Sequence, residues 1–140
     1  YEINDSAPQA IVFQFNGSEV DLTLDTTVNE SSSQFNVTEI RPSVFYNKNL
    51  QSLTLPNELK KIGSSAFYVN PLEDLALPSS LEYIEEEAFY NNQIAGTFTL
   101  PNSVTSIAVH AFNFNAITDL NLGSGIAVIL TGVFGNNNAI

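Results

Sequence analysis

The 140-residue chain contains no cysteine, methionine or tryptophan, and its single histidine is His110. Without cysteine the protein has no disulfide, no thiol nucleophile and no thiolate metal site. With one histidine, metal binding and acid/base catalysis have few candidate residues. These absences argue against an enzyme, and we expect no cofactor.

Basic side chains are also scarce, because four Lys and Arg stand against 15 Asp and Glu, which gives a formal net charge of −11. This excess of negative charge repels nucleic acids and anionic lipid head groups. No apolar run approaches the roughly 20 residues that a membrane-spanning helix needs. We therefore expect no nucleic-acid partner and no direct insertion into a membrane.

What the sequence does contain is a repeat. Phenylalanines recur every 22 or 23 residues, and isoleucines keep the same register five residues earlier. The two columns are Phe45, Phe67, Phe89, Phe112 and Phe134, and Ile40, Ile62, Ile84, Ile107 and Ile129. A repeat of this length is typical of a solenoid, in which each coil buries its apolar side against the next.

Each unit combines a strand Leu-x-x-Leu-x-Leu-Pro, a short return Leu-x-x-Ile and a turn Ala-Phe-x-x-Asn. Leu53 and Leu55 are two residues apart and so point to one face of an extended strand, which Pro56 ends because proline cannot donate a hydrogen bond. Asparagines follow each phenylalanine by three residues, at Asn70, Asn92, Asn115 and Asn137. They are expected to form a ladder of amide hydrogen bonds to the turns, with a row of polar ligand groups as the alternative.

This pattern resembles the Treponema-type (BspA-like) leucine-rich repeats, whose consensus is close to Leu-x-x-Leu-x-Leu-Pro-x-x-Leu-x-x-Ile-Gly-x-x-Ala-Phe-x-x-Asn/Cys. The stretch from Leu53 to Asn70 matches it almost position by position, and the resemblance covers about residues 37–140. It implies a mainly β fold, a short leucine-rich-repeat solenoid of about four to five coils. It also implies a bacterial or protozoan repeat protein, extracellular or on the cell surface, used for adhesion or host-protein binding.

Residues 1–36 do not follow the repeat. Apolar and polar residues alternate in two short runs, and Asn16-Gly17 lies between them. The apolar members are Ile11, Phe13 and Phe15 in the first run, and Val20, Leu22 and Leu24 in the second. Asn-Gly accepts the positive φ angles of a tight turn, so the pattern predicts a β-hairpin that caps the first coil, followed by a polar loop at 25–34. We expect one structural domain, with the hairpin cap and loop at 1–36 and the solenoid at 37–140.

The outward positions of the predicted strands form the first candidate binding surface, here called the strand face. One column comprises Ser52, Asp74, Thr97 and Asp119, and the next comprises Thr54, Ala76, Thr99 and Asn121. Leucine-rich repeats commonly bind through this surface, so its hydroxyls and carboxylates are candidates to hold a sugar or a peptide. An ordinary solvated sheet face explains the same residues equally well.

Three tyrosines, Tyr46, Tyr68 and Tyr90, directly follow the repeated phenylalanines and form a second candidate, the tyrosine row. Phenol rings along one edge could stack on sugar rings or anchor a partner protein. The favoured interpretation is that they cover the turn and stack on one another. The counterparts in the next two repeats are Asn113 and Gly135, so the row is expected to be local.

The remaining polar residues offer little chemistry. His110 shares its position in the repeat with Ser65, Glu87 and Gly132, which indicates a variable, exposed turn position. The acidic run 85–87 lacks the alternating oxygen spacing and the glycine turn of calcium loops. A solvated acidic turn is therefore favoured, and no metal site is predicted.

We conclude that the sequence favours a non-catalytic ligand-binding or adhesion module of a secreted or cell-surface protein. Its expected partner is a protein or carbohydrate ligand, for example on a host cell. The alternative is a structural spacer or self-association element of a larger surface protein, in which the C-terminal repeat end packs against another copy.

Overall fold

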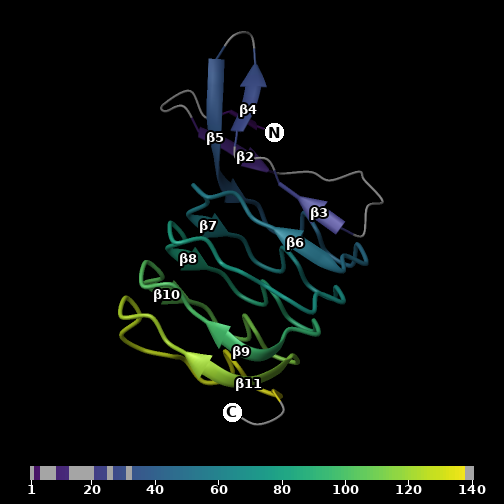
Figure 1. Ribbon diagram of the computed structural model, residues 1–140, viewed down its shortest axis with the longest axis vertical. Helices are drawn as coiled ribbons and strands as arrows, with labels where there is room; N and C mark the ends of the chain where they lie inside the picture. Colours follow the sequence, from purple (N-terminus) through teal and green to yellow (C-terminus); the bar gives the residue numbers. More distant parts are fainter. Residues whose placement is uncertain (1, 4–8, 13–20, 25–26, 31–32, 138–140) are drawn as a thin grey trace.

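The computed structural model describes residues 2–3, 9–12, 21–24, 27–30 and 33–137, and these residues contain no helix. The strands are β1 (Glu2–Ile3), β2 (Gln9–Val12), β3 (Asp21–Thr23), β4 (Thr27–Glu30), β5 (Ser33–Ile40), β6 (Ser52–Thr54), β7 (Lys61–Ile62), β8 (Tyr83–Ile84), β9 (Ala95–Thr99), β10 (Ser106–Ile107) and β11 (Ala116–Asn121). Figure 1 shows coils stacked one upon another. The mainly β solenoid predicted from the repeat is thus confirmed.

We number the coils 1 (residues 21–49), 2 (50–71), 3 (72–93), 4 (94–116) and 5 (117–137). One wall of the solenoid, the back sheet, contains β5, β7, β8 and β10 as parallel neighbours. The opposite wall consists of two separate parallel pairs, β3 with β6 and β9 with β11. Equivalent residues of neighbouring coils lie side by side, as Ile62 does beside Ile84, so the sequence repeat becomes a repeat in space.

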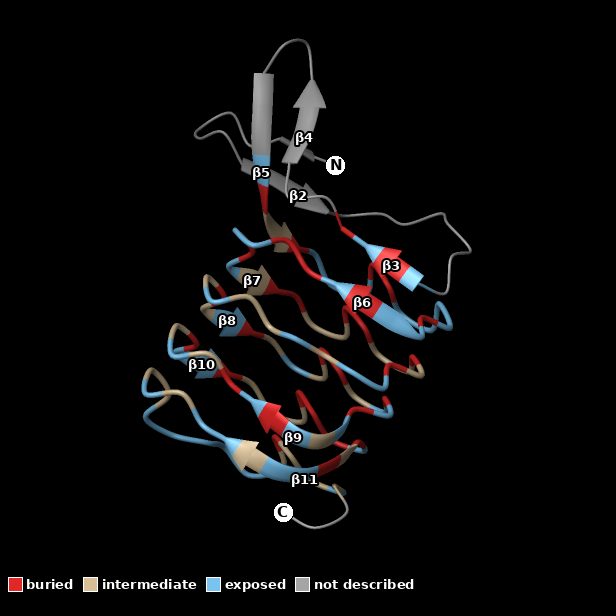
Figure 2. Ribbon diagram, viewed as in Figure 1, coloured by how far each residue is buried: buried red, intermediate tan, exposed pale blue. Residues whose placement is uncertain are grey.

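The repeated phenylalanines form a continuous column inside the coils. Phe45, Phe67, Phe89 and Phe112 have no exposed surface, and Phe134 is partly buried against the same core. Adjacent ring centroids are 5.0 to 5.4 Å apart, and the ring planes differ by 10° or less. Figure 2 shows buried segments on the inner side of every coil, so one core extends along the stack.

Each turn around a phenylalanine contains two residues with positive φ, one two positions before the ring and one two positions after it. The first set comprises Ser43, Ser65, Glu87, His110 and Gly132, and the second Asn47, Val69, Asn91, Phe114 and Asn136. His110 (φ 58°) therefore occupies the turn position that its spacing predicts, but it is half-buried and not fully exposed. Val69 and Phe114 are unusual members, because β-branched and bulky residues rarely adopt positive φ.

The predicted asparagine ladder is confirmed. Asn70, which is only 2% exposed, donates from Nδ2 to the carbonyls of Phe45 (2.8 Å) and Phe67 (3.0 Å). Its Oδ1 accepts from the backbone N–H groups of Lys48 and Leu50. Asn115 and Asn137 make the corresponding bonds in coils 4 and 5. Each amide thus joins the turn of its own coil to the preceding one.

The hairpin predicted around Asn16-Gly17 is wrong. β2 pairs with β1 and β5, whereas β3 pairs in parallel with β6, so the two expected arms lie in different sheets. Leu22, beside Leu53 in this register, and Leu24 are buried in the core and supply the strand of coil 1. The hairpin prediction failed because apolar and polar residues alternate with period two in a solenoid strand just as they do in a hairpin arm. The predicted turn itself falls on residues 13–20, outside the described residues.

The loop predicted at 25–34 also contains a strand that the sequence did not indicate. β4 pairs antiparallel with β5, with Thr27 opposite Asn36 and Glu30 opposite Ser33. Polar composition had suggested a loop, but threonine and valine favour extended backbone. β5 crosses residue 36, and the domain limits of 1–36 and 37–140 remain a prediction.

Coil 3 lacks the strand that its Leu-x-x-Leu-x-Leu pattern predicts, since residues 71–78 form no strand. Pro71 provides the reason. At the equivalent positions of the next two repeats, Gln93 and Ala116 donate backbone hydrogen bonds to the carbonyls of Leu72 and Ile94. Proline has no N–H and cannot make this bond, so the coil enters its strand segment without that contact to coil 2.

Candidate functional site

The strand-face residues project into solvent as predicted. Ser52 and Thr54 lie on β6, and they are exposed, as are Asp74 and Ala76 in coil 3. On β9 and β11 the side chains pair across the strands, Thr97 beside Asp119 and Thr99 beside Asn121. The structure thus brings hydroxyl, carboxylate and amide groups together in two small polar pairs.

Two members of this face were missed by the sequence analysis. Asp21 and Thr23 on β3 lie beside Ser52 and Thr54, and the Ser52 hydroxyl donates to Asp21 Oδ1 over 2.8 Å. The signal was present, because both residues alternate with the buried Leu22. It was assigned to a hairpin arm, so the polar columns were begun one coil too late.

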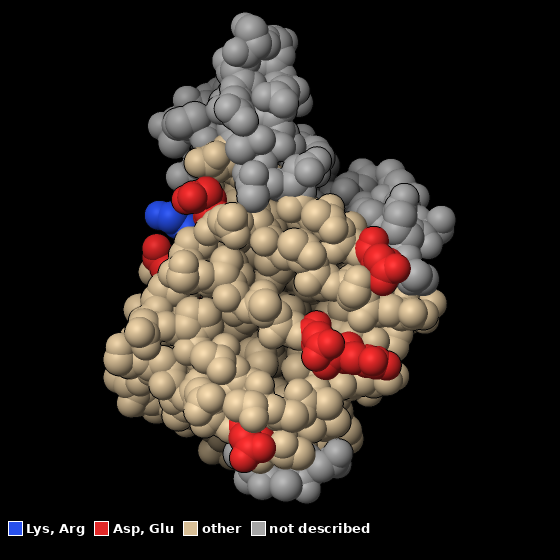
Figure 3. Space-filling model, in the orientation of Figure 1, with Lys and Arg blue, Asp and Glu red and all other residues tan. Residues whose placement is uncertain are grey.

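The strand face is interrupted at coil 3, where strand pairing is missing. A hollow of about 280 Å³ opens between coils 2 and 3, and among its lining residues are Thr54, Asn57, Ala76 and Pro78. Figure 3 shows acidic side chains scattered over this side of the molecule, with basic ones gathered at one edge. The face can therefore offer a shallow, mainly apolar recess with two uncharged polar side chains, Thr54 and Asn57, and separate carboxylates outside it.

The tyrosine row stacks on itself, as the sequence interpretation favoured. The ring centroids of Tyr46 and Tyr68 are 5.0 Å apart, those of Tyr68 and Tyr90 are 4.8 Å apart, and the rings are nearly parallel. Both faces of Tyr68 are consequently covered by its neighbours. A sugar ring cannot stack on Tyr68, which can present only its ring edge and hydroxyl group to solvent.

One further ring, which lies outside the repeat position of the tyrosines, contacts the end of the row. Phe114 contacts Tyr90, with ring centroids 5.3 Å apart and planes tilted by 58°, and its side chain is exposed. The counterpart by spacing, Asn113, is buried and accepts a hydrogen bond from Asn136. Sequence register alone missed this contact because Phe114 comes from the neighbouring positive-φ column.

The environment of Tyr68 alters its acidity. Loss of solvent around the ring raises the pKa of the Tyr68 phenol above its ordinary value of 10.0, and nearby Glu87, Tyr90 and Tyr46 act in the same direction. A raised pKa means that the phenol stays protonated and can donate a hydrogen bond over a wider pH range.

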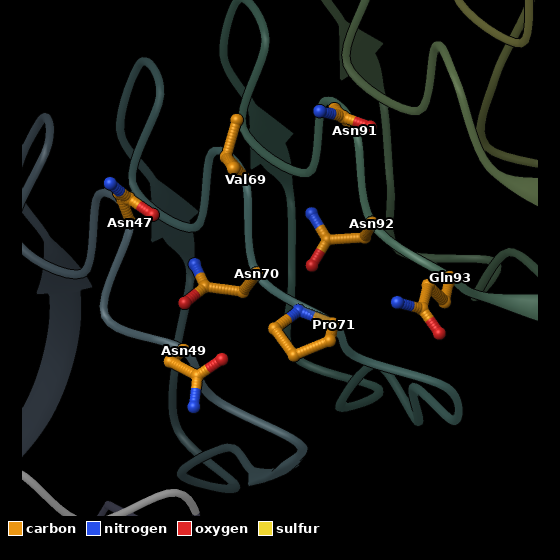
Figure 4. Close-up of a pocket in the computed structure, with 8 residues that line it drawn as sticks. All are labelled: Asn47, Asn49, Val69, Asn70, Pro71, Asn91, Asn92 and Gln93. Atoms are coloured by element: carbon orange, nitrogen blue, oxygen red, sulfur yellow. The ribbon is translucent and has the colours of Figure 1, made fainter.

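An amide-lined pocket of about 240 Å³ lies beside the tyrosine row (Figure 4). Its lining residues include Asn47, Asn70, Asn91, Asn92 and Gln93. Oδ1 of Asn92 is buried and has no hydrogen-bond partner among the described residues. Asn70 Oδ1 accepts from the N–H groups of Lys48 and Leu50, whereas Asn92 Oδ1 has no equivalent bonds among the described residues. Pro71, which has no N–H group, lies at this point of the ladder.

The acidic run is more than a solvated turn. Glu85 bonds to Lys61 (Nζ to Oε1, 2.7 Å) and accepts from the Ser64 N–H and hydroxyl, while Glu87 accepts from Ser65. The hydrogen bond from Lys61 lowers the pKa of Glu85, and the same bond raises the pKa of Lys61. Within the described ranges, no three His, Cys, Asp or Glu side chains are grouped closely enough to hold a metal ion.

No helix among the described residues is long and apolar enough to cross a membrane. The sequence profile of the BspA type leucine rich repeat region matches residues 24–140 in 6 copies. A search of curated protein sequences finds no significant match.

Two solved structures have a similar fold. A leucine rich cell surface protein from Faecalibacterium prausnitzii aligns over 89% of this chain with a TM-score of 0.61 and 22% sequence identity. A leucine-rich repeat protein from Bacteroides ovatus aligns over 84% of the chain with a TM-score of 0.54 and 17% identity. The chain spans 41% and 37% of the lengths of these two proteins, respectively.

Proposed function

Because the chain belongs to the BspA-type leucine-rich repeat family, we propose that it is a non-catalytic binding module of a secreted or cell-surface bacterial protein. It holds a protein or glycan ligand on the strand face and serves adhesion. The observation that carries this proposal is the pairing of exposed Thr97 with Asp119 and Thr99 with Asn121. Repetition converts single polar side chains into an array, so weak contacts can add over several coils.

The hollow beside Thr54 also supports the strand face as the binding surface. A ligand that spans coils 2 to 5 would place one group in this recess of about 280 Å³ and others on Asp74 and Asp119. Concave sites with a few polar groups are the usual form of ligand pockets. The fold similarity to a cell surface protein of Faecalibacterium prausnitzii agrees with an extracellular location.

The test is binding of the purified domain to arrayed glycans and to surface-labelled proteins of host cells. The D74A/D119A double variant should weaken any binding found, by about 1.5–3 kcal/mol for each lost charged hydrogen bond. An E58A/E86A double variant removes the same charge from other exposed positions and should bind as the wild type does. Equal binding by both double variants would contradict the placement on the strand face.

A second candidate function, self-association, is favoured by the surface of coil 5. Leu122, Val128, Ile129 and Leu130 are 51%, 67%, 36% and 48% exposed. Clustered exposed apolar residues are typical of protein interfaces. Sedimentation analysis should then show dimers that the V128D/L130D variant abolishes, whereas a wild-type monomer at all concentrations would contradict this function.

A further inference from the structure

We propose a second ligand subsite, for an uncharged monosaccharide unit, on the back sheet around Tyr83. The inference rests on the proposed ligand-binding function, but it places a contact on the wall opposite the strand face. Its basis is a hollow of about 310 Å³ lined by Lys61, Tyr83, Ile84, Glu85, Ser106 and Ala108.

The strand register explains why the hollow exists. Lys61, Tyr83 and Ser106 lie side by side on β7, β8 and β10 and alternate with the buried isoleucine column. Coil 4 carries only Ser106 and Ala108 where coil 3 carries Tyr83 and Glu85. These small side chains leave space next to the tyrosine ring, with Ile84 among the lining residues.

Tyr83 differs from the tyrosine row in its ring environment. Tyr68 is stacked between Tyr46 and Tyr90, whereas no aromatic ring of the described residues contacts Tyr83, which is 46% exposed. A free aromatic face carries partial negative charge and attracts the polarised C–H groups of a sugar ring. Tyr83 is therefore available as a stacking platform where Tyr68 is not.

The polar groups of the hollow are already fixed in position. Lys61 Nζ lies 2.7 Å from Glu85 Oε1 and 3.8 Å from Glu39 Oε1, and Glu85 Oε2 accepts from Ser64. Such a pair can accept from one sugar hydroxyl and donate to another without rearrangement. The two carboxylates more than neutralise the single ammonium, and the whole chain carries a charge of −11, so the hollow favours an uncharged ligand over an anionic one.

The test measures saturation-transfer difference NMR of the full chain with the methyl glycosides of glucose, galactose, mannose and N-acetylglucosamine. At least one glycoside should bind, and Y83A should weaken it about tenfold, as expected for the loss of one stacking contact. Y83F keeps the platform and should bind normally. A108L should block binding by filling the hollow.

Y46A is the matched control, because Tyr46 is 47% exposed but lies in the stacked row. It should bind as the wild type does. Absence of binding by all four glycosides, equal losses in Y46A and Y83A, or full binding by both Y83A and A108L would overturn the subsite. Loss in D74A/D119A with full binding in Y83A would leave the strand-face proposal standing while this one fails.

Discussion

Phe67 and Tyr68 are adjacent in sequence, and each belongs to an aromatic stack that runs along the solenoid. The stacks have almost the same spacing, since Phe67 and Phe89 are 5.1 Å apart and Tyr68 and Tyr90 are 4.8 Å apart. Both distances are close to the separation of paired β-strands, roughly 4.8 Å. The backbone ladder therefore sets the ring spacing, and geometry alone does not distinguish the two stacks.

Burial is what separates them. Phe67 is fully enclosed, whereas Tyr46 at the start of the other stack is 47% exposed and Tyr68 is half-buried. Stabilisation follows the apolar area removed from water more closely than it follows ring stacking. The phenylalanine column should therefore hold the fold, while the tyrosine row can change with little loss of stability.

The largest expected effect comes from removing one ring of each stack. F67A should lower the free energy of unfolding by about 3–5 kcal/mol, because it leaves a cavity between Phe45 and Phe89. Y68A should lower the free energy of unfolding by about 1 kcal/mol, since the variant loses only the stacking contacts of a half-buried ring. Urea denaturation of both variants provides the measurement. Equal losses would mean that the two stacks share one structural role.

The phenylalanine column could be predicted from sequence because five independent positions repeat an apolar residue that only a stacked core explains. The asparagine ladder followed from the same register. The strand of coil 1 could not be predicted from the sequence, because Leu22 and Leu24 lie outside the regular repeat. β4 and much of β5 are inserted between these leucines and Ile40. The Tyr83 hollow was missed for another reason, since it depends on which side chains of adjacent coils are small.

The next prediction concerns the asparagine ladder. N70A should lower the free energy of unfolding by about 3 kcal/mol, because it leaves the buried carbonyl of Phe45 and the N–H groups of Lys48 and Leu50 without the partner that Asn70 supplies. N92A should lower it by only about 1–2 kcal/mol, since Asn92 Oδ1 has no hydrogen-bond partner to lose in the described part of the chain. Thermal unfolding measures the difference, and a costlier N92A would contradict the assigned bonding.

A smaller, opposite effect is expected beside the tyrosine row. Val69 follows Tyr68 with φ 54°, a conformation that costs most residues about 1–2 kcal/mol and suits asparagine better. V69N should therefore raise the free energy of unfolding by about 1 kcal/mol. The reverse change at the equivalent position, N91V, should lower it by a similar amount. If both variants are destabilised, contacts of the native side chains outweigh backbone strain.

The smallest expected effect is a pH dependence of stability caused by the phenol of Tyr68. The phenylalanine column cannot show it, because phenylalanine has no group that titrates. Folding raises the pKa of Tyr68 above its ordinary value of 10.0, chiefly because the ring is desolvated and also because Glu87 is near. An unfolded chain releases this proton near pH 10, while the folded chain retains it to higher pH. Stability from the neutral phenol is thus fully present below pH 10 and is lost as the pH rises through the folded pKa.

Y68F removes the titrating group but keeps the ring in the stack. The stability of the wild type should fall more steeply than that of Y68F above pH 10.0, and the two curves should run parallel below it. The phenolate absorbance of the wild type minus that of Y68F reports the titration of Tyr68 directly. A midpoint at or below the pKa of free tyrosine would show that water and counterions reach the phenol, and the tyrosine row would then be as open to solvent as Tyr83.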